Sequence, residues 1–230
     1  MSEVYKQTLW MPHNFLPTNP DLHHRLLSLL ASLFLAAIVS VPAFAADAGS
    51  NANAAVPGSI NYVEGQVSMG TRALDSKSIG TIELQTGQSL TTQKGKAEIL
   101  LTPGVFLRVG NNSSVKMISP SLTDTEVSID KGHAMVEVAE IHPENDIRIS
   151  EDGSTTRLLK TGLYDFSLSQ DQLRVFDGKA SVDDGGRSVT VKGGRMLNLA
   201  ESSPLKRSKF SSAPHRPGGW AIANPRSRLV

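Results

Sequence analysis

Three residues in one short polar stretch could together hold a metal ion. The stretch IHPENDIRI contains His142, Glu144 and Asp146, an imidazole and two carboxylates of the kind that bind divalent transition metals. Pro143 and Asn145, which lie between them, favour turns and predict a polar loop between two strands. We therefore expect a connecting loop here and no metal site.

Two other stretches place carboxylates beside glycines, an arrangement that calcium-binding loops also use. They are EDGS at 151–154 and DDGG at 183–186. Neither has the spacing that a six-ligand calcium loop requires. Both are therefore predicted to be turns, and no cofactor or metal ion is expected in the chain.

One histidine could form a pH-sensitive contact. His133 directly follows Gly132, and the pKa of an imidazole lies near neutral pH. The residues after comparable glycines are also polar, namely Gln66, Lys179 and Arg195. We interpret all four as polar residues at exposed turn edges. The stretch NNSS at 111–114 contains glycosylation sequons, but we interpret it as a turn rich in hydrogen bonds from side chain to backbone.

The common catalytic motifs are missing from the sequence. There is no G-x-S-x-G nucleophile elbow, no H-E-x-x-H zinc motif and no G-x-x-x-x-G-K-[ST] phosphate loop. The absence of cysteine excludes disulfides, thiolate metal sites and cysteine nucleophiles. Most ionisable residues alternate with apolar ones, which is typical of strands with one solvated face. We expect no catalytic residue and no enzymatic activity.

The elements that position these residues are predicted to be short strands. From Ser59 onward, apolar residues recur in runs of strand length, as in YDFSL at 164–168, and no stretch keeps a 3.6-residue period. Scarce aromatic residues with frequent Gly, Ser and Thr favour short strands and tight turns. The sequence therefore predicts an all-β domain.

Glycines mark a loose internal repeat within this domain. An apolar residue stands three positions before each of the following: Gly65, Gly87, Gly104, Gly132, Gly162, Gly178 and Gly194. A tight reversal needs a positive φ, which glycine adopts without a Cβ clash, so we expect structural turns at all of them. Their spacing is too irregular for a strict solenoid. The predicted architecture is a solenoid-like β-roll of antiparallel hairpins, with a β-sandwich as the alternative.

The N-terminal segment, residues 1–45, has the pattern of an export signal. Arg25 precedes an uncharged apolar run at 26–41, which we expect to be helical. The small residues that define the predicted cleavage site are Ala43, Ala45 and Ala46. A retained membrane anchor is the alternative, because about 17 to 25 apolar residues span a bilayer. Met11 is an alternative start to Met1.

Composition divides the remaining chain into three parts. Residues 46–57 are small and polar and are predicted to be a disordered linker. Residues 58–200 hold the strand-like runs and a surplus of acidic groups, and form the predicted β domain. Residues 201–230 are rich in Pro, Ser and Arg and are predicted to be a basic disordered tail, whose charge could attract an anionic partner.

The order of several motifs resembles the FecR domain, the periplasmic domain of ferric dicitrate-type regulators and of many exported proteins. The motifs are GQSLTTQKGKAEILLTPGVFLRVGNNSSVKM at 87–117, VSIDKGHAMVEV at 127–138, TGLYDFSL at 161–168 and LRVFDGKASV at 173–182. The resemblance extends over about residues 58–200, and Leu163 stands where the family usually has threonine. It implies an all-β, solenoid-like domain used for binding or signalling, with no catalytic residue.

We therefore expect an exported, non-catalytic domain that binds a partner protein or an envelope ligand such as a glycan. The alternative is a membrane-anchored regulator of the FecR type, held through residues 26–41, whose cytoplasmic segment restrains a sigma factor. The residues before the apolar run are few for an independent cytoplasmic domain. A β-helical polysaccharide-active enzyme would need acids clustered on one face. No nucleic-acid partner is expected, because the domain is predicted to be periplasmic or secreted.

Overall fold

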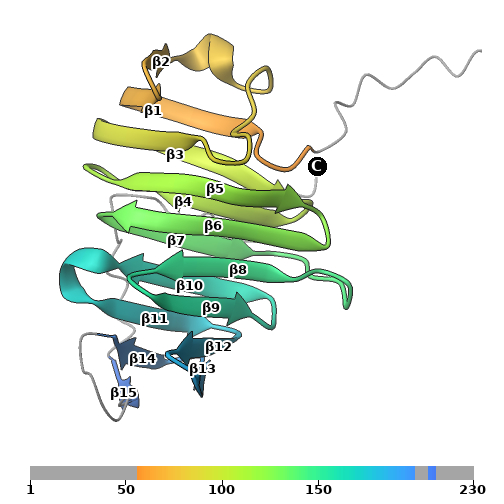
Figure 1. Ribbon diagram of the computed structural model, residues 1–230, viewed down its shortest axis with the longest axis vertical. Coiled ribbons are helices and arrows are strands. Elements are labelled where there is room, and N and C mark those ends of the chain that lie inside the picture. Colours follow the sequence, from red (N-terminus) through yellow and green to blue (C-terminus); the bar gives the residue numbers. More distant parts are fainter. Residues whose placement is uncertain (1–55, 200–206, 211–230) are drawn as a thin grey trace, which may run out of the picture. The chain divides into compact units, whose positions relative to one another are not determined.

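The computed structural model describes residues 56–199 and 207–210, and almost all of its regular structure is β-strand (Figure 1). The strands are β1 (Ile60–Met69), β2 (Arg72–Leu74), β3 (Ser89–Thr102), β4 (Val105–Val109), β5 (Ser114–Ser121), β6 (Asp124–Lys131), β7 (His133–Val138), β8 (Ile147–Glu151), β9 (Ser154–Leu158), β10 (Gly162–Ser167), β11 (Gln172–Asp177), β12 (Lys179–Asp184), β13 (Arg187–Lys192), β14 (Arg195–Asn198) and β15 (Arg207–Lys209). Two short 3-10 helices accompany them, η1 (Ser76–Ser78) and η2 (Leu168–Gln170). The predicted all-β class is confirmed. Within the described ranges, no helix is long and apolar enough to cross a membrane.

Several sequence predictions concern residues outside the described ranges. They are the apolar helix at 26–41, the cleavage site at Ala43, Ala45 and Ala46, residues 46–55 of the linker, and the tail from 211 onward. These stay predictions. Within the predicted tail, however, Arg207–Lys209 form strand β15, which pairs with β14. An open sheet edge offers hydrogen bonds to the backbone of a strand whatever its side chains, so composition alone did not reveal this strand.

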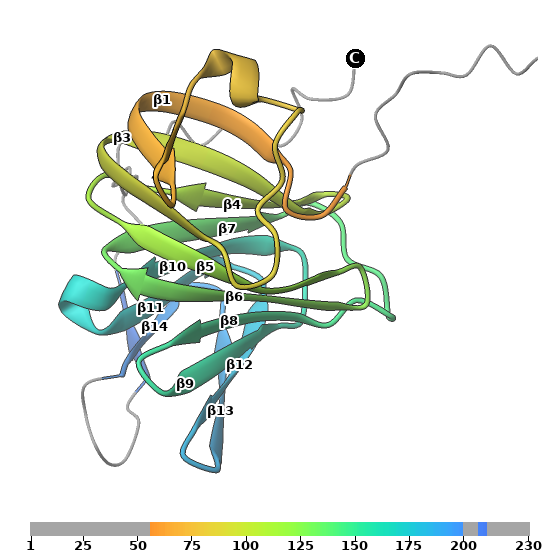
Figure 2. The same cartoon turned by 45° about the horizontal axis from the view of Figure 1, so that its top comes forward.

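The strands form one continuous sheet that turns back on itself at β3. Its order is β13-β12-β9-β8-β6-β5-β3-β4-β7-β10-β11-β14-β15. Strands β5, β6, β8, β9, β12 and β13 form one layer, the front layer, and β4, β7, β10, β11, β14 and β15 form the back layer behind it (Figures 1 and 2). Both layers belong to this one sheet, so neither the predicted solenoid-like roll nor a sandwich of two separate sheets is confirmed.

Most of the repeated glycines lie at corners, where the chain passes from one layer to the other. The corner glycines are Gly132, Gly162, Gly178 and Gly194. Gly65 lies within β1, opposite Gly95 of β3 at a shift of the register. Gly104 lies in the β3–β4 hairpin, and Gly87 lies in the turn before β3. The prediction of hairpin turns was therefore wrong for the corner glycines. All seven have positive φ, and because both a hairpin and a corner require it, the sequence pattern does not distinguish the two.

Successive corners also approach one another closely. A Cβ on Gly132 would collide with Ser113 Oγ and would lie 2.6 Å from Asn112 O, which belong to the preceding corner. A Cβ on Gly178 would collide with the hydroxyl of Tyr164. Side chains larger than hydrogen are therefore excluded at these corners by packing as well as by backbone conformation.

The corner between β4 and β5, residues 110–113, is held by a buried threonine of β3. Thr92 Oγ1 donates to Gly110 O and accepts from Ser113 N at 3.0 Å. Ser113 Oγ accepts from His133 N at 2.9 Å, which joins this corner to the next one. The interpretation of NNSS as a turn rich in hydrogen bonds from side chain to backbone is confirmed, and Ser113 and Thr92 make the central contacts.

Alternate residues of each strand face the core between the layers. In β8, Ile147 and Ile149 are fully buried, whereas Arg148 between them is not. Tyr164 and Phe166 of β10 contribute the largest buried aromatic side chains from the back layer. Because side chains alternate across a strand, every second residue of β6, β8 and β9 lies on the outer face of the front layer.

Candidate functional site

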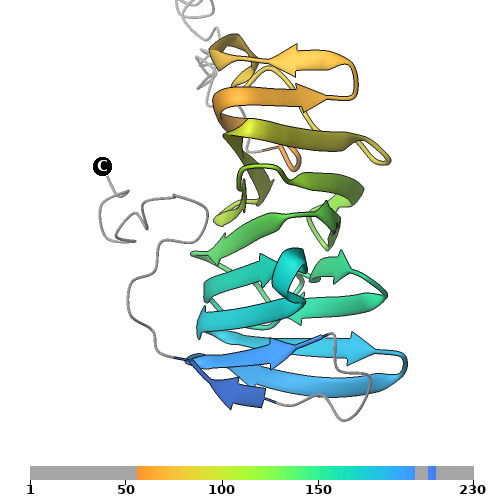
Figure 3. The same ribbon diagram turned by 90° about the vertical axis from the view of Figure 1, so that its left-hand side faces the viewer.

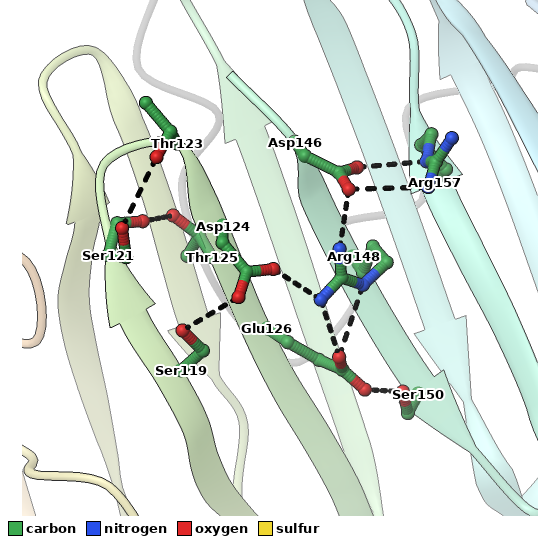
Figure 4. A network of polar contacts seen from close by, with 10 residues as sticks. All are labelled: Ser119, Ser121, Thr123, Asp124, Thr125, Glu126, Asp146, Arg148, Ser150 and Arg157. Atoms are coloured by element: carbon green, nitrogen blue, oxygen red, sulfur yellow. Dashed lines mark hydrogen bonds and ion pairs between the residues drawn. The ribbon is translucent and has the colours of Figure 1, made fainter. Parts of the chain in front are cut away.

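An arginine on the outer face of the front layer is surrounded by carboxylates. Arg148 Nη2 lies 2.5 Å from Asp124 Oδ1 and 2.9 Å from Glu126 Oε2, and its Nη1 lies 2.5 Å from Asp146 Oδ2 (Figure 4). Arg157 Nε lies 2.8 Å from the other oxygen of Asp146. We call these five residues the Arg148 network.

Strand pairing brings these residues together. Strands β6 and β8 are parallel, with Glu126 opposite Arg148, and Arg157 of β9 lies opposite Arg148 on its other side. Asp124 stands two residues before Glu126, and Asp146 stands two residues before Arg148. Because side chains two residues apart on a strand point to the same face, both aspartates lie on the outer face with Arg148. Outward-facing residues opposite one another on paired strands lie within contact distance. The network is thus a direct consequence of the register.

The charges of the network satisfy one another. Partial burial disfavours the charged form of Arg148, but its hydrogen bonds to Glu126, Asp124 and Asp146 raise the pKa of the guanidinium above its ordinary value. Ser150 Oγ donates to Glu126 Oε1 at 2.6 Å and holds that carboxylate in place. The guanidinium remains charged and its donors are committed to carboxylates. The network therefore provides a rigid polar surface rather than a group that transfers protons.

A groove of about 580 Å³ shares two residues with the network. One wall is residues 141–146 of the loop between β7 and β8, and the other is residues 157–159 at the end of β9. We call it the β7–β8 groove. Among its lining residues, Asp146 and Arg157 are joined by an ion pair that holds their side chains in place. Its apolar lining residues include Leu159, which is 38% exposed, and Ile141, which is half-buried.

The three residues considered for a metal site do not converge. Asp146 is bound by two arginines, His142 Nε2 lies 3.2 Å from Glu140 Oε1, and Glu144 is exposed. Among residues 56–199 and 207–210, no group of His, Asp and Glu side chains is arranged to hold a metal ion. The stretch is a loop, as the sequence predicts.

Asn145 closes this loop, a role that the sequence analysis did not identify. Its Oδ1 accepts from His142 N at 2.8 Å, and its Nδ2 donates to Leu122 O at 2.8 Å in the β5–β6 turn. Asparagine is frequent in turns because its short side chain bonds to nearby backbone groups, so its presence here is the only signal the sequence offered. The groove wall is thereby tied to the neighbouring hairpin.

A second row of ionic contacts lies on the outer face of the back layer. Arg108 Nε lies 2.8 Å from Glu98 Oε2, and the guanidinium also pairs with Glu137. His133 pairs with Asp165, whose side chain is only 1% exposed. The interpretation of His133 as a polar residue at an exposed turn edge was therefore wrong. Its partner is distant in the sequence, and only the pairing of β7 with β10 brings the two together.

Glu151, at the end of β8, lies on the core side of the strand rather than with Arg148. It is 3% exposed, and its Oε1 has no hydrogen-bond partner among the described residues. Burial, followed by the charges of Asp171, Asp165 and Asp152, raises the pKa of Glu151 to about 8. A carboxyl that is protonated at neutral pH is a poor calcium ligand. EDGS and DDGG form the turns of the β8–β9 and β12–β13 hairpins, as predicted.

Residues 88–181 match the protein family described as FecR protein. This segment contains strands β3 to β11 and the first part of β12, and it includes the whole Arg148 network. The resemblance predicted from the motifs is confirmed over these residues. A search of curated proteins found no match.

Two solved structures are similar to part of the chain. Both are crystal structures of a protein described as a "putative anti-sigma factor" from Parabacteroides distasonis ATCC 8503, with 12% and 11% sequence identity and a TM-score of 0.45 each. In each case the similarity covers 53% of this chain and 59% of the other chain. The chain thus matches less than two thirds of either relative's length.

Proposed function

We propose, on the basis of the FecR match over residues 88–181, that this chain is an exported, non-catalytic regulatory protein whose β domain binds a partner protein. The contact surface in this proposal is the β7–β8 groove. The observation that carries it is that one groove is lined both by the apolar residues Leu159 and Ile141 and by the ion pair of Asp146 with Arg157.

This combination suits a protein partner better than a reacting substrate. Protein interfaces typically surround apolar anchor points with polar groups that exclude water and fix orientation. A catalytic groove would instead need a base or nucleophile that is free to react. Asp146 and Arg157 are committed to each other, and Glu144 lies on the exposed loop.

Photo-crosslinking in cells tests the role of the groove. A photoreactive amino acid is placed at Leu159 of the full chain, and the matched control carries it at Ile79, an aliphatic residue of the same exposure (37% against 38%) after helix η1. We expect a discrete crosslinked product from position 159 and none from position 79. Crosslinking of equal yield at both positions, or at neither, would contradict the proposed contact surface.

The proposed location is the periplasm, with residues 26–41 acting as a cleaved signal. Mass spectrometry of the purified protein is expected to give a mature N-terminus at Ala46. Alkaline phosphatase fused after residue 199 is expected to be active, since that enzyme requires export. An inactive fusion would contradict export, whereas an uncleaved but active fusion would support the membrane-anchored alternative.

The membrane-anchored regulator is the second candidate function, and the FecR match favours it as well. In that case residues 1–25 would act in the cytoplasm on a sigma factor. Deletion of these residues would then change transcription of a reporter that depends on the sigma factor, while the exported domain stays in place. An unchanged reporter would favour the soluble periplasmic form.

A further inference from the structure

The two ends of the sheet meet at a seam on the C-terminal side of the domain. Strand β13 ends the front layer and β15 ends the back layer, and both lie in the last strands of the stack (Figure 3). The two edges do not pair through their backbones. A side chain joins them instead, because Arg207 Nη1 of β15 donates to Thr190 O of β13 at 3.1 Å.

A hollow of about 350 Å³ lies at this seam. Its lining residues are Thr190, Lys192, Arg195 and Arg207, from β13, β14 and β15. We call it the seam pocket. Three of its four lining side chains are cationic, and Thr190 adds a hydroxyl.

Strand pairing places two more cations next to the pocket. Lys179 of β12 lies opposite Lys192, and Lys209 of β15 lies opposite Arg195. Like charges directly opposite each other on paired strands are destabilising. The pairs Lys179–Lys192 and Arg195–Lys209 are therefore both expected to lower the stability of this end of the sheet.

No carboxylate in the described parts of the chain forms an ion pair with Lys192, Arg195 or Arg207. Asp177, at the neighbouring corner, uses its Oδ1 to accept from Gly178 N at 2.8 Å. Asp184 pairs with Arg187 at the other end of β13. Among residues 56–199 and 207–210, no ion pair therefore neutralises the positive charge of the pocket.

We propose that the seam pocket binds a phosphate-type oxyanion. Guanidinium groups from two strands and an ammonium group can donate charge-assisted hydrogen bonds to one tetrahedral anion, and these bonds are about twice as strong as neutral ones. The bound anion would also remove the repulsion between the cross-strand cations. The same chemistry is offered by a soluble phosphate ester and by the headgroup of an anionic phospholipid, and the test separates these two sources.

The test compares two double variants that remove equal charge, one at the seam pocket and one on strands distant from it in the sheet. The pocket variant is Lys192→Gln with Arg195→Gln, and the control variant is Arg72→Gln with Lys94→Gln, in β2 and β3. Inorganic phosphate is titrated into the full chain and followed by amide NMR shifts, with chloride at equal ionic strength as reference. A thermal unfolding midpoint for each variant shows that it is folded. Lys192→Gln alone serves if the double variant unfolds, because the side chain of Lys192 is exposed.

We expect phosphate to shift the amides around Thr190 and Gly194 of the wild-type protein and of the control variant. Binding is expected to weaken by about tenfold or more in the pocket variant, which corresponds to about 1.4 kcal/mol. Equal weakening in both double variants, or shifts that chloride reproduces, would overturn the proposal, because either result indicates general attraction of anions.

Vesicles then separate the two sources of phosphate. Flotation is measured with vesicles of phosphatidylglycerol and phosphatidylcholine, and with vesicles of phosphatidylcholine alone. Binding to the anionic vesicles that the pocket variant loses and the control variant keeps assigns the site to a lipid headgroup. Phosphate binding at the pocket without vesicle binding assigns it to a soluble phosphate ester.

Discussion

The Arg148 network and the seam pocket use the same side chains in opposite ways. Both gather arginines on neighbouring strands of one sheet, but Arg148 is enclosed by three carboxylates, whereas Arg195 and Arg207 have none as ion-pair partners among the described residues. The network lies in the middle of the sheet, where strands on both sides supply partners, and the pocket lies where the sheet ends. Strand β8 is paired on both sides, and its neighbours place carboxylates beside Arg148. Strands β13 and β15 are each paired on one side only, so fewer neighbouring side chains can neutralise their cations.

The largest expected difference between the middle and the end of the sheet is the loss of stability when a corner glycine is replaced by alanine. We expect Gly132→Ala to lower the free energy of unfolding by about 4 kcal/mol, because it combines a left-handed backbone with a collision against Ser113 and Asn112. Gly194→Ala at the seam meets open space and is expected to cost about 1 kcal/mol, from its backbone alone. Chemical denaturation measures both. Equal losses would show that corner packing does not depend on position.

The pH dependence of stability tests Glu151, a buried carboxyl on the strand that carries Arg148. Its folded pKa of about 8 lies above the ordinary 4.5, so the stability that it contributes is present below pH 4.5 and is lost as pH rises toward 8. We expect Glu151→Gln to match the wild type at low pH and to be about 4 kcal/mol more stable at pH 8. Glu144→Gln, which changes an exposed carboxyl that does not contribute to the raised pKa of Glu151, is the control and should leave the slope unchanged. A wild-type stability that does not fall between these pH values would disprove the burial effect.

Removal of the central cation tests whether the network is structural. We expect Arg148→Leu to lower the free energy of unfolding by about 2 kcal/mol, because Asp124, Glu126 and Asp146 then face one another without a cation, and partial exposure moderates the cost. Arg195→Leu at the seam pocket is expected to change it by less than about 0.5 kcal/mol. Urea denaturation provides both values. Equal losses in the two variants would contradict the conclusion that Arg148 stabilises the fold and that Arg195 does not.

The smallest expected effect concerns repulsion at the seam pocket. Lys192→Gln removes one charge from the pair with Lys179 and is expected to raise stability by a few tenths of a kcal/mol at low salt. The gain should disappear at high salt, because screening removes the repulsion in the wild type as well. Lys94→Gln, on β3 in the middle of the strand order, is expected to show no such gain. Thermal unfolding at two ionic strengths measures the effect, and a loss of stability in Lys192→Gln would show that the cations are not in conflict.

The candidate site shows how far local patterns reach. The stretch around His142 and Asp146 was identified from its residue types, and its loop character follows from Pro143 and Asn145. The sequence gives no signal for a special role of Arg148, because a single arginine between two isoleucines is typical of any strand with one solvated face. Its partners Asp124 and Glu126 belong to β6, and only the parallel pairing of β6 with β8 brings them to it. Parallel pairing joins residues that are distant in the sequence, so no local spacing announces it.

The strands and the glycines with positive φ were predictable from the sequence by itself, because alternation and the cost of a Cβ are properties of a residue and its neighbours. The tertiary structure decided that Gly132 is a corner while Gly104 is a hairpin turn, since the difference lies in which strands pair on either side. It also decided that His133 meets Asp165 and that Glu151 is buried with no hydrogen-bond partner for its Oε1 among the described residues. In the same part of the chain, no carboxylate forms an ion pair with the cations of the seam pocket. Each of these depends on contacts between strands far apart in the chain, where pairing and burial, rather than residue type, determine the energy of a charge.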